Sequence, residues 1–337
     1  MCDIMAATPE ANYLYKLFDD TQFKAKMVVP YDDFLYHNPK QLDQLLSMHA
    51  RRGKTVVIDK TAEHLHNEQQ AIELKNKLDE HGLLDRAVVF DNTADETYFE
   101  RHGVRHQYIE GYIWFYLSNA DRPKPKDKNL SHKFLCMNSF SKEHRWAIIS
   151  ALHNQNLIDD VLWSYRDTAK YFPDNPYAHF DFVRPTYIDQ PLDAQGNEVS
   201  QAQNFNQNLN LDDIYSRSEY TIVTETDFDE PHLSSCTEKS YLSLFYETLP
   251  IVVSVPGTVQ MLKSQGFDVF DDIVDHAYDN ETDHKKRFGM IIDEVKRLKE
   301  IHPNIEPNRH KFNRSHMTDR AYWQKQINNK LKSYRFD

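Results

Sequence analysis

The sequence predicts an α/β fold with two domains, each built on a parallel sheet. Short runs rich in Val and Ile alternate with helical segments, and these runs are apolar throughout, which is typical of parallel strands buried on both faces. A length of 337 residues favours two domains. The charged, proline-bearing stretch 121–128 contains no apolar residue and has the composition of a linker between them.

The apolar runs of the first half predict strands at 26–30, 54–59 and 86–91. Helices are expected at 39–51, 68–81, 95–102 and 110–119, with Gly82 closing the second. The second half repeats the alternation, with strands at 133–137, 161–165, 220–225 and 251–255. Its helices are expected at 142–155, 238–248, 258–265 and 282–301, and a last one runs from the Thr318-Asp319 cap to about residue 332. Residues 189–210, rich in Asn, Gln and Asp, interrupt this pattern as a long loop.

One segment of the second half carries the clearest chemical signal. The order of strand, loop, helix and strand around Thr237-Glu238-Lys239 puts this tripeptide at a helix start, at the carboxyl edge of a parallel sheet. Helix N-terminal N–H groups at such an edge bind nucleotides and phosphates in open α/β folds, and the lysine adds a positive charge. We therefore expect the functional site here.

This segment also resembles a known family. Thr237-Glu238-Lys239, the apolar helix and Pro250-Ile251-Val252-Val253 resemble the nucleotide-sugar site of GT-B glycosyltransferases, notably fucosyltransferase-like ones. The stretch 256–271 resembles a set of such enzymes from phages and marine microbes, and 134–145 resembles the start of their donor domain. The resemblance covers about residues 130–300. It implies a GT-B-like fold of two Rossmann-type domains with a cleft between them.

The resemblance also implies a division of labour along the chain. Residues 1–128 would form the acceptor-side domain, 129–310 the donor domain, and 311–337 a C-terminal helix that crosses back to the first domain. Lys239 and Arg145 would stabilise the leaving diphosphate, and Glu238 would bind the ribose. The relatives tend to carry Arg after the Asn of the first motif, whereas this chain has Ser139 and Phe140. The implied donor-binding residues are Asn138, Ser139, Glu225, Thr237, Glu238, Lys239 and Ser240.

The acceptor hydroxyl needs a base, which we expect from a carboxylate at a strand end of the first domain. Asp32 and Asp33 are the first candidates, and Asp59 and Asp91 lie at comparable positions. The sequence pairs no second carboxylate with any of them, so inversion and retention of the sugar configuration both stay open.

The predicted function is a hexosyl- or pentosyltransferase that moves a sugar from a nucleotide-sugar donor to an acceptor hydroxyl. The acceptor would be a glycan or a hydroxymethylated base of phage DNA, and no metal or cofactor is expected. Two alternatives stay open. Asp227 and Asp229 form an Asp-x-Asp pair that a metal-dependent sugar transferase would use, or the protein is inactive and binds a nucleotide or a partner.

Composition and missing motifs exclude other classes. The chain has no Gly-x-Gly-x-x-Gly, P-loop or Gly-x-Ser-x-Gly motif, which argues against dehydrogenases, P-loop enzymes and α/β-hydrolases. A net charge of −12 argues against a general nucleic-acid binder, although 308–337 is basic and would dock on an acidic body or meet an anionic acceptor. Without a membrane-spanning run, a signal peptide or closely spaced cysteines, a cytoplasmic location is expected, in the host if the protein is viral.

Overall fold

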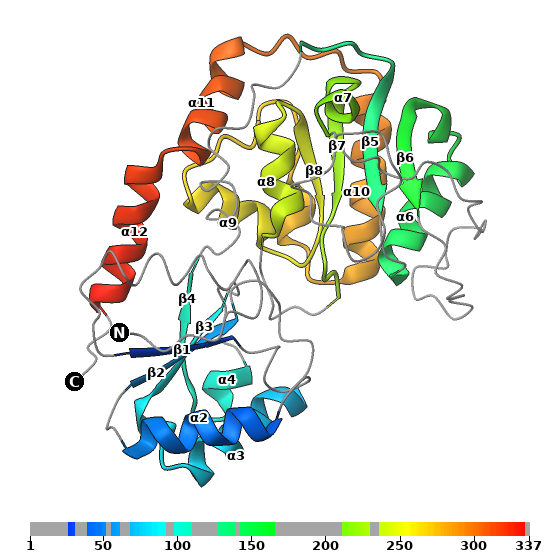
Figure 1. Cartoon of the computed structure of the whole chain (residues 1–337). Helices are drawn as coiled ribbons and strands as arrows, with labels where there is room; N and C mark the ends of the chain where they lie inside the picture. Colours follow the sequence, from blue (N-terminus) through cyan, green and yellow to red (C-terminus); the bar gives the residue numbers. More distant parts are fainter. Residues whose placement is uncertain are drawn as a thin grey trace. The chain divides into compact units, whose positions relative to one another are not determined.

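The computed structural model describes residues 26–30, 39–51, 55–60, 68–91, 98–109, 127–138, 142–165, 211–229 and 236–333. The chain forms two compact units, Met1–Asp121 with Thr318–Asp337, and Arg122–Met317. Each unit contains a four-stranded parallel sheet (Figure 1). The predicted class, α/β with two Rossmann-type parallel sheets, is confirmed. The units divide at 121/122 and 317/318, where the sequence suggested 128/129 and 310/311.

The sheet of the first unit follows the chain order without a reversal. Its strands are β1 (Lys26–Pro30), β2 (Thr55–Lys60), β3 (Ala87–Asp91) and β4 (Arg105–Tyr108). Every residue of β3 is buried, as a strand covered on both faces requires. The strand β4 was not predicted, because its Arg-His-Gln-Tyr sequence lacks an apolar run and all four residues are partly exposed. Its pairing with β3 makes it a strand.

Three helices pack against one face of this sheet: α2 (Pro39–Arg51), α3 (Glu68–Glu80) and α4 (Tyr98–Arg101). Gly82 takes the left-handed φ of 62° that ends α3, as its position in the sequence predicted. The helix α12 (Arg320–Ser333) belongs to the same unit, and its Lys330 ammonium lies 4.2 Å from the ring centroid of Tyr108. The apolar core between helices and sheet consists of Leu46, Val56, Ile58, Ala71, Leu74, Leu78, Leu83, Ala87, Val89, Phe99 and Val104.

The sheet of the second unit has a reversal in strand order. Its strands are β5 (His132–Asn138), β6 (Val161–Tyr165), β7 (Ser218–Thr224) and β8 (Leu249–Val253), arranged as β6-β5-β7-β8. The chain leaves β5 toward one edge of the sheet and leaves β7 toward the other. The carboxyl ends of β5 and β7 therefore form a topological switch point, the place where open α/β sheets bind their ligands.

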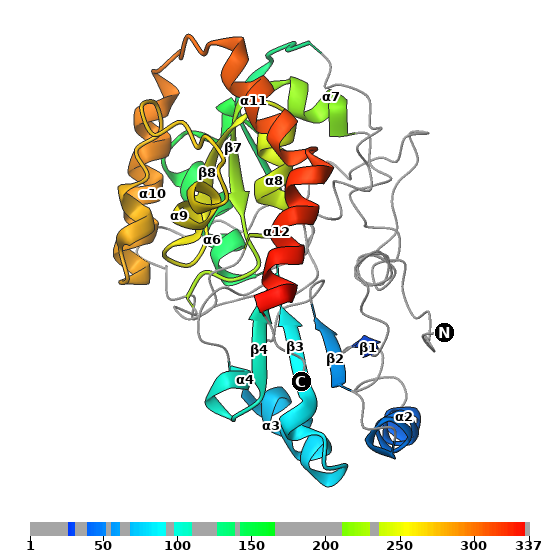
Figure 2. The same cartoon turned by 90° about the vertical axis from the view of Figure 1, so that its left-hand side faces the viewer.

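The helices of the second unit cover both faces of its sheet. Figure 2 shows α6 (Glu143–Asn154) and α10 (His284–Lys299) on one side of the strands, with α8 (Glu238–Phe245) and α11 (Pro307–Met317) on the other. Right-handed crossovers that leave β5 and β7 in opposite directions place α6 and α8 on opposite faces, as observed. Two shorter helices complete the unit, α7 (Leu211–Ser216) and α9 (Thr258–Ser264).

The helix α11 was not predicted, because it is held by polar contacts and lacks an apolar stripe. Only two of its residues, Asn313 and Met317, are buried. Arg309 makes paired contacts with the carboxylates of Asp268 and Asp272 at 2.6 to 2.9 Å. This part of the basic C-terminal segment therefore docks on acidic side chains of its own unit.

The C-terminal end of α8 is held by basic residues from both ends of the second unit. The Lys128 ammonium donates to three backbone carbonyls, including that of Tyr246 at 3.1 Å. Arg314 of α11 pairs with Glu247 at 2.5 Å. Glu247 ends α8 with a left-handed φ of 60°, a conformation in which glycine is the usual residue. The contact with Arg314 gives a side chain at this position a role that glycine could not fill.

The predicted helix 110–119 and loop 189–210 lie outside the described residues. Among the helices that the structure does describe, none is both long and apolar enough to cross a bilayer.

Candidate functional site

The Thr-Glu-Lys motif begins α8, as predicted. Thr237 is the residue that caps the helix, in an extended conformation, and its hydroxyl accepts a hydrogen bond from the Lys239 backbone N–H at 3.4 Å. Glu238 is the first helical residue. The motif thus stands at the carboxyl edge of the sheet, where α8 follows the strand β7.

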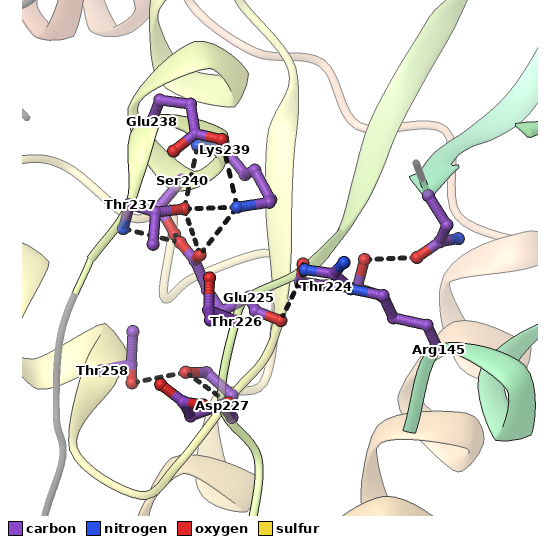
Figure 3. A network of polar contacts seen from close by, with 12 residues as sticks. Arg145, Thr224, Glu225, Thr226, Asp227, Thr237, Glu238, Lys239, Ser240 and Thr258 are labelled. Atoms are coloured by element: carbon purple, nitrogen blue, oxygen red, sulfur yellow. Dashed lines mark hydrogen bonds and ion pairs between the residues drawn. The ribbon is translucent and has the colours of Figure 1, made fainter. Parts of the chain in front are cut away.

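Glu225, the residue after β7, fixes this helix start with a buried carboxylate. Its side chain is 1% exposed. One oxygen accepts from the Thr237 N–H at 3.0 Å and the Ser240 hydroxyl at 2.6 Å, and the other accepts from the Thr237 hydroxyl (Figure 3). A negative charge at a helix N-terminus is favourable, because it meets the positive end of the helix dipole. Both oxygens of Glu225 therefore hold the first turn of α8.

Lys239 lies over this arrangement with its ammonium partly open. The side chain is 27% exposed, and its Nζ donates to the Thr237 hydroxyl at 2.8 Å. The same Nζ lies 3.1 Å from a Glu238 carboxylate oxygen and 3.8 Å from one of Glu225. Burial acts to raise the pKa of Glu238, but the adjacent Lys239 ammonium outweighs it and holds that pKa below its usual value. Glu238 and Lys239 are therefore a charged pair at the helix start.

Side chains from other elements hold the backbone of the connection between β7 and α8. The carbonyls of five consecutive residues, 224 to 228, each accept a hydrogen bond from a side chain. The donors are Arg145 to Thr224 and Glu225, His144 to Glu225, Lys142 to Thr226, Ser254 to Asp227, and Arg287 to Phe228. Such a fully bonded stretch has a fixed backbone, so the residues that it carries are placed rigidly at the switch point.

Arg145 is one of these donors and is almost fully buried, with 4% exposure. Its guanidinium donates to the Glu225 carbonyl at 3.1 Å and to the Thr224 carbonyl at 3.4 Å. In this structure Arg145 supports the loop beside the expected diphosphate position. Its direct contact with a diphosphate stays a prediction.

Asn138 connects the two strand ends that form the switch point. It is the last residue of β5, is 3% exposed, and accepts a hydrogen bond from the Thr224 hydroxyl of β7 at 2.6 Å. Its own amide donates to the Cys136 thiol at 3.4 Å. Asn138 therefore joins the other site residues through Thr224.

Other predicted residues lie apart from this group or outside the described chain. Ser139, Asp32 and Asp33 are outside the described residues, and so is the side chain of Asp59. Asp91 is fully buried at the carboxyl end of β3, in the first unit. It is the one candidate for the acceptor base whose side chain the structure describes.

Lys142 is a site residue that our reading of the sequence missed. It immediately precedes α6, is 36% exposed, and donates from Nζ to the Thr226 carbonyl at 2.7 Å. Burial lowers its pKa, the Asp227 carboxylate opposes this, and the positive charges of Arg145 and Lys239 lower it further. The sequence signal that could have identified Lys142 is its position. It follows β5, so it lies at the same carboxyl edge of the sheet as Lys239.

Three cations at this edge lie among the carboxylates of Glu225, Asp227 and Glu238, so an anion would meet exposed ammonium groups and not a net positive charge. Lys142 and Lys239 are both partly exposed, and the buried Arg145 adds its charge behind the loop. In the parts of the chain that the structure describes, no three or more His, Cys, Asp or Glu side chains gather as a metal site needs. Metal independence stays a prediction.

Comparison with known proteins finds only distant similarity. No protein-family model and no curated protein matches the sequence. A DNA-modifying β-glucosyltransferase, solved with and without its substrate uridine diphosphoglucose, is similar with a TM-score of 0.48 and 11% identity, over 98% of this chain and 97% of that chain. Phage T4 BGT in complex with UDP and Mn²⁺ is similar with a TM-score of 0.48 and 12% identity, over 98% and 96%. At this degree of similarity, only the chain's own residues can carry a function.

Proposed function

We propose that the protein is a glycosyltransferase whose second unit binds the diphosphate of a nucleotide-sugar donor. The observation that supports this best is the placement of Lys142 and Lys239 at the switch point, beside the first turn of α8. A diphosphate carries its charge on several oxygens, so two partly exposed ammonium groups match it. The same groups would stabilise the charge that develops on the leaving diphosphate.

The transfer requires one bond to break and one to form. The bond between the anomeric carbon and the diphosphate oxygen breaks, the acceptor oxygen bonds to that carbon, and a base takes the acceptor proton. The candidates for this base are Asp32 and Asp33, followed by Asp59 and Asp91. The transferred group would be a hexose or a pentose, and the acceptor a glycan or a hydroxymethylated base of phage DNA.

The deciding experiment is a thermal-shift panel of nucleotides and sugar nucleotides. Uridine diphosphoglucose, the substrate named for one similar structure, is included with its guanosine and adenosine counterparts. We expect a selective rise in melting temperature with one nucleoside diphosphate and its sugar derivatives. A protein that no member of this panel stabilises would contradict the donor site. Stabilisation without turnover over a range of acceptors would favour the inactive nucleotide-binding protein.

Transfer should continue after divalent metals are removed. In our proposal the positive charges of Lys142, Arg145 and Lys239 take the place of a metal at the leaving diphosphate. Activity in excess EDTA should therefore equal activity in added Mg²⁺ or Mn²⁺. Activity that is lost in EDTA and restored by Mn²⁺ would favour the metal-dependent transferase that uses Asp227 and Asp229.

Affinity for a nucleoside diphosphate should fall as the pH rises. Burial and two neighbouring cations lower the pKa of Lys142 more than Asp227 raises it. The ammonium of Lys142 therefore loses its proton at a lower pH than a free lysine does. A bound diphosphate stabilises the charged form, so binding takes up a proton at pH values above that lowered pKa. Calorimetric titration of UDP or GDP from neutral pH to about pH 10 measures this effect. Lys142→Arg, which stays charged, should flatten the pH dependence, and an unchanged slope would exclude Lys142 from the site.

A further inference from the structure

Asp227 carries a carboxylate oxygen for which the described residues provide no partner. Its side chain is only 15% exposed, and within that part of the chain its buried Oδ2 accepts no hydrogen bond. The nearest cation, the Lys142 ammonium, is 3.8 Å from the other oxygen, which is beyond hydrogen-bond distance. A buried carboxylate oxygen without a donor destabilises the folded state, so its presence calls for an explanation.

The comparison with Glu225 shows that this oxygen is exceptional at its sheet edge. The two carboxylates stand two residues apart after the same strand. Glu225 receives three hydrogen bonds from Thr237 and Ser240 and has a structural task. Asp227 has its backbone carbonyl tied to Ser254, so its position is fixed while its side chain keeps the capacity to accept. Of this pair, Asp227 is the residue equipped to meet a ligand.

The surroundings of Asp227 favour a neutral donor over a second cation. Lys142 is its nearest positive group. A divalent ion needs further ligands from the chain, and among the described residues no three His, Cys, Asp or Glu side chains gather to supply them. A hydroxyl group donates one hydrogen bond, brings no charge, and comes with any sugar nucleotide that places its diphosphate on Lys142 and Lys239.

We propose that Asp227 accepts a hydrogen bond from a sugar hydroxyl of the donor and thereby contributes to donor selectivity. This inference rests on the proposed function, because it places the sugar hydroxyl next to the diphosphate. The hydroxyl belongs to the ribose or to the transferred sugar, which share the same chemistry. The exposed 15% of the side chain gives a ligand hydroxyl access to this carboxylate.

The test compares Asp227→Ala with Asp293→Ala, a matched control at an exposed position of α10. Calorimetry measures the affinities of UDP, 2′-deoxy-UDP and UDP-glucose, and of the corresponding guanosine compounds. A hydrogen bond to a charged group predicts a loss of roughly 10- to 100-fold for ligands that carry the contacted hydroxyl. If that hydroxyl is the 2′-hydroxyl of the ribose, UDP or GDP loses affinity and its 2′-deoxy form does not, and if it is the 3′-hydroxyl, both forms lose affinity. If it is on the transferred sugar, only the sugar nucleotide loses affinity.

Stability provides a second readout that separates this role from a structural one. Asp227→Ala removes the unpartnered oxygen, so its melting temperature should equal or exceed that of the wild type. A large drop would show that the carboxylate supports the fold and would overturn the proposal. Wild-type affinities in Asp227→Ala would also overturn it, and so would Mn²⁺ binding that the wild type shows and Asp227→Ala loses. If the wild type binds none of the six ligands, the proposed donor site itself fails. If the wild type binds them and Asp227→Ala binds them equally well, only the role of Asp227 fails.

Discussion

Replacing Lys239 with alanine should lower turnover by roughly 10²- to 10³-fold, or about 2–4 kcal/mol of transition-state stabilisation. The ammonium lies at the start of α8, is 27% exposed, and is held by the Thr237 hydroxyl at 2.8 Å. We expect it to face the leaving diphosphate, so its removal takes away a charge-assisted contact. Affinity for the nucleoside diphosphate should fall with turnover. Steady-state kinetics and calorimetry measure the two effects.

The fold should tolerate this change, because a partly exposed lysine contributes about 1 kcal/mol or less. The matched control is Lys285→Ala, at an exposed position near the start of α10. Lys142→Ala is unsuitable as a control, because Lys142 lies beside Asp227. A Lys239→Ala protein that melts normally and keeps the wild-type rate would remove Lys239 from the site and weaken the glycosyltransferase proposal.

Replacing Glu225 with alanine should lower the free energy of unfolding by about 3–5 kcal/mol. The buried carboxylate accepts three hydrogen bonds from the first turn of α8, and its loss leaves donors of Thr237 and Ser240 without an acceptor. Lys239 would also lose a negative neighbour at 3.8 Å. Equilibrium unfolding in urea measures the change. Glu225→Gln keeps one acceptor oxygen, so its free energy of unfolding should lie between those of the wild type and Glu225→Ala.

Two further variants show whether this effect comes from the helix start. Glu300→Ala, at an exposed position, should change the free energy of unfolding by no more than about 0.5 kcal/mol. Ser240→Ala should lose much of its own effect in the Glu225→Ala background, because the two side chains share one hydrogen bond. Independent, additive effects would contradict the contact, and a Glu225→Ala protein as stable as the Glu300 control would contradict its importance.

The sequence predicted the elements whose signals are local. The apolar strands β7 and β8 and the threonine cap of α8 are all readable from short stretches, and the structure has them where expected. The strand β4 and the helix α11 lack apolar patterns and exist through pairing with β3 and through ion pairs of Arg309. Such tertiary contacts leave no local signal.

The same distinction applies to the site. The sequence placed Glu225 near the Thr-Glu-Lys motif, but its contact with Thr237 depends on how the intervening loop folds back. Lys142 was overlooked because its importance comes from the neighbourhood of β5 and β7, two strands that are far apart in the chain. Asp227 has the appearance of an exposed acidic residue in the sequence, and only the structure shows its buried oxygen.

The anchoring of α8 has a mechanical consequence. Lys128 follows the first passage of the chain between the units, Arg314 precedes the second, and both are fastened to residues 246 and 247 at the end of α8. The opposite end of this helix carries Lys239. Any displacement of α8 along its axis would therefore act on Lys128 and Arg314 together, because both contact the same end of this helix.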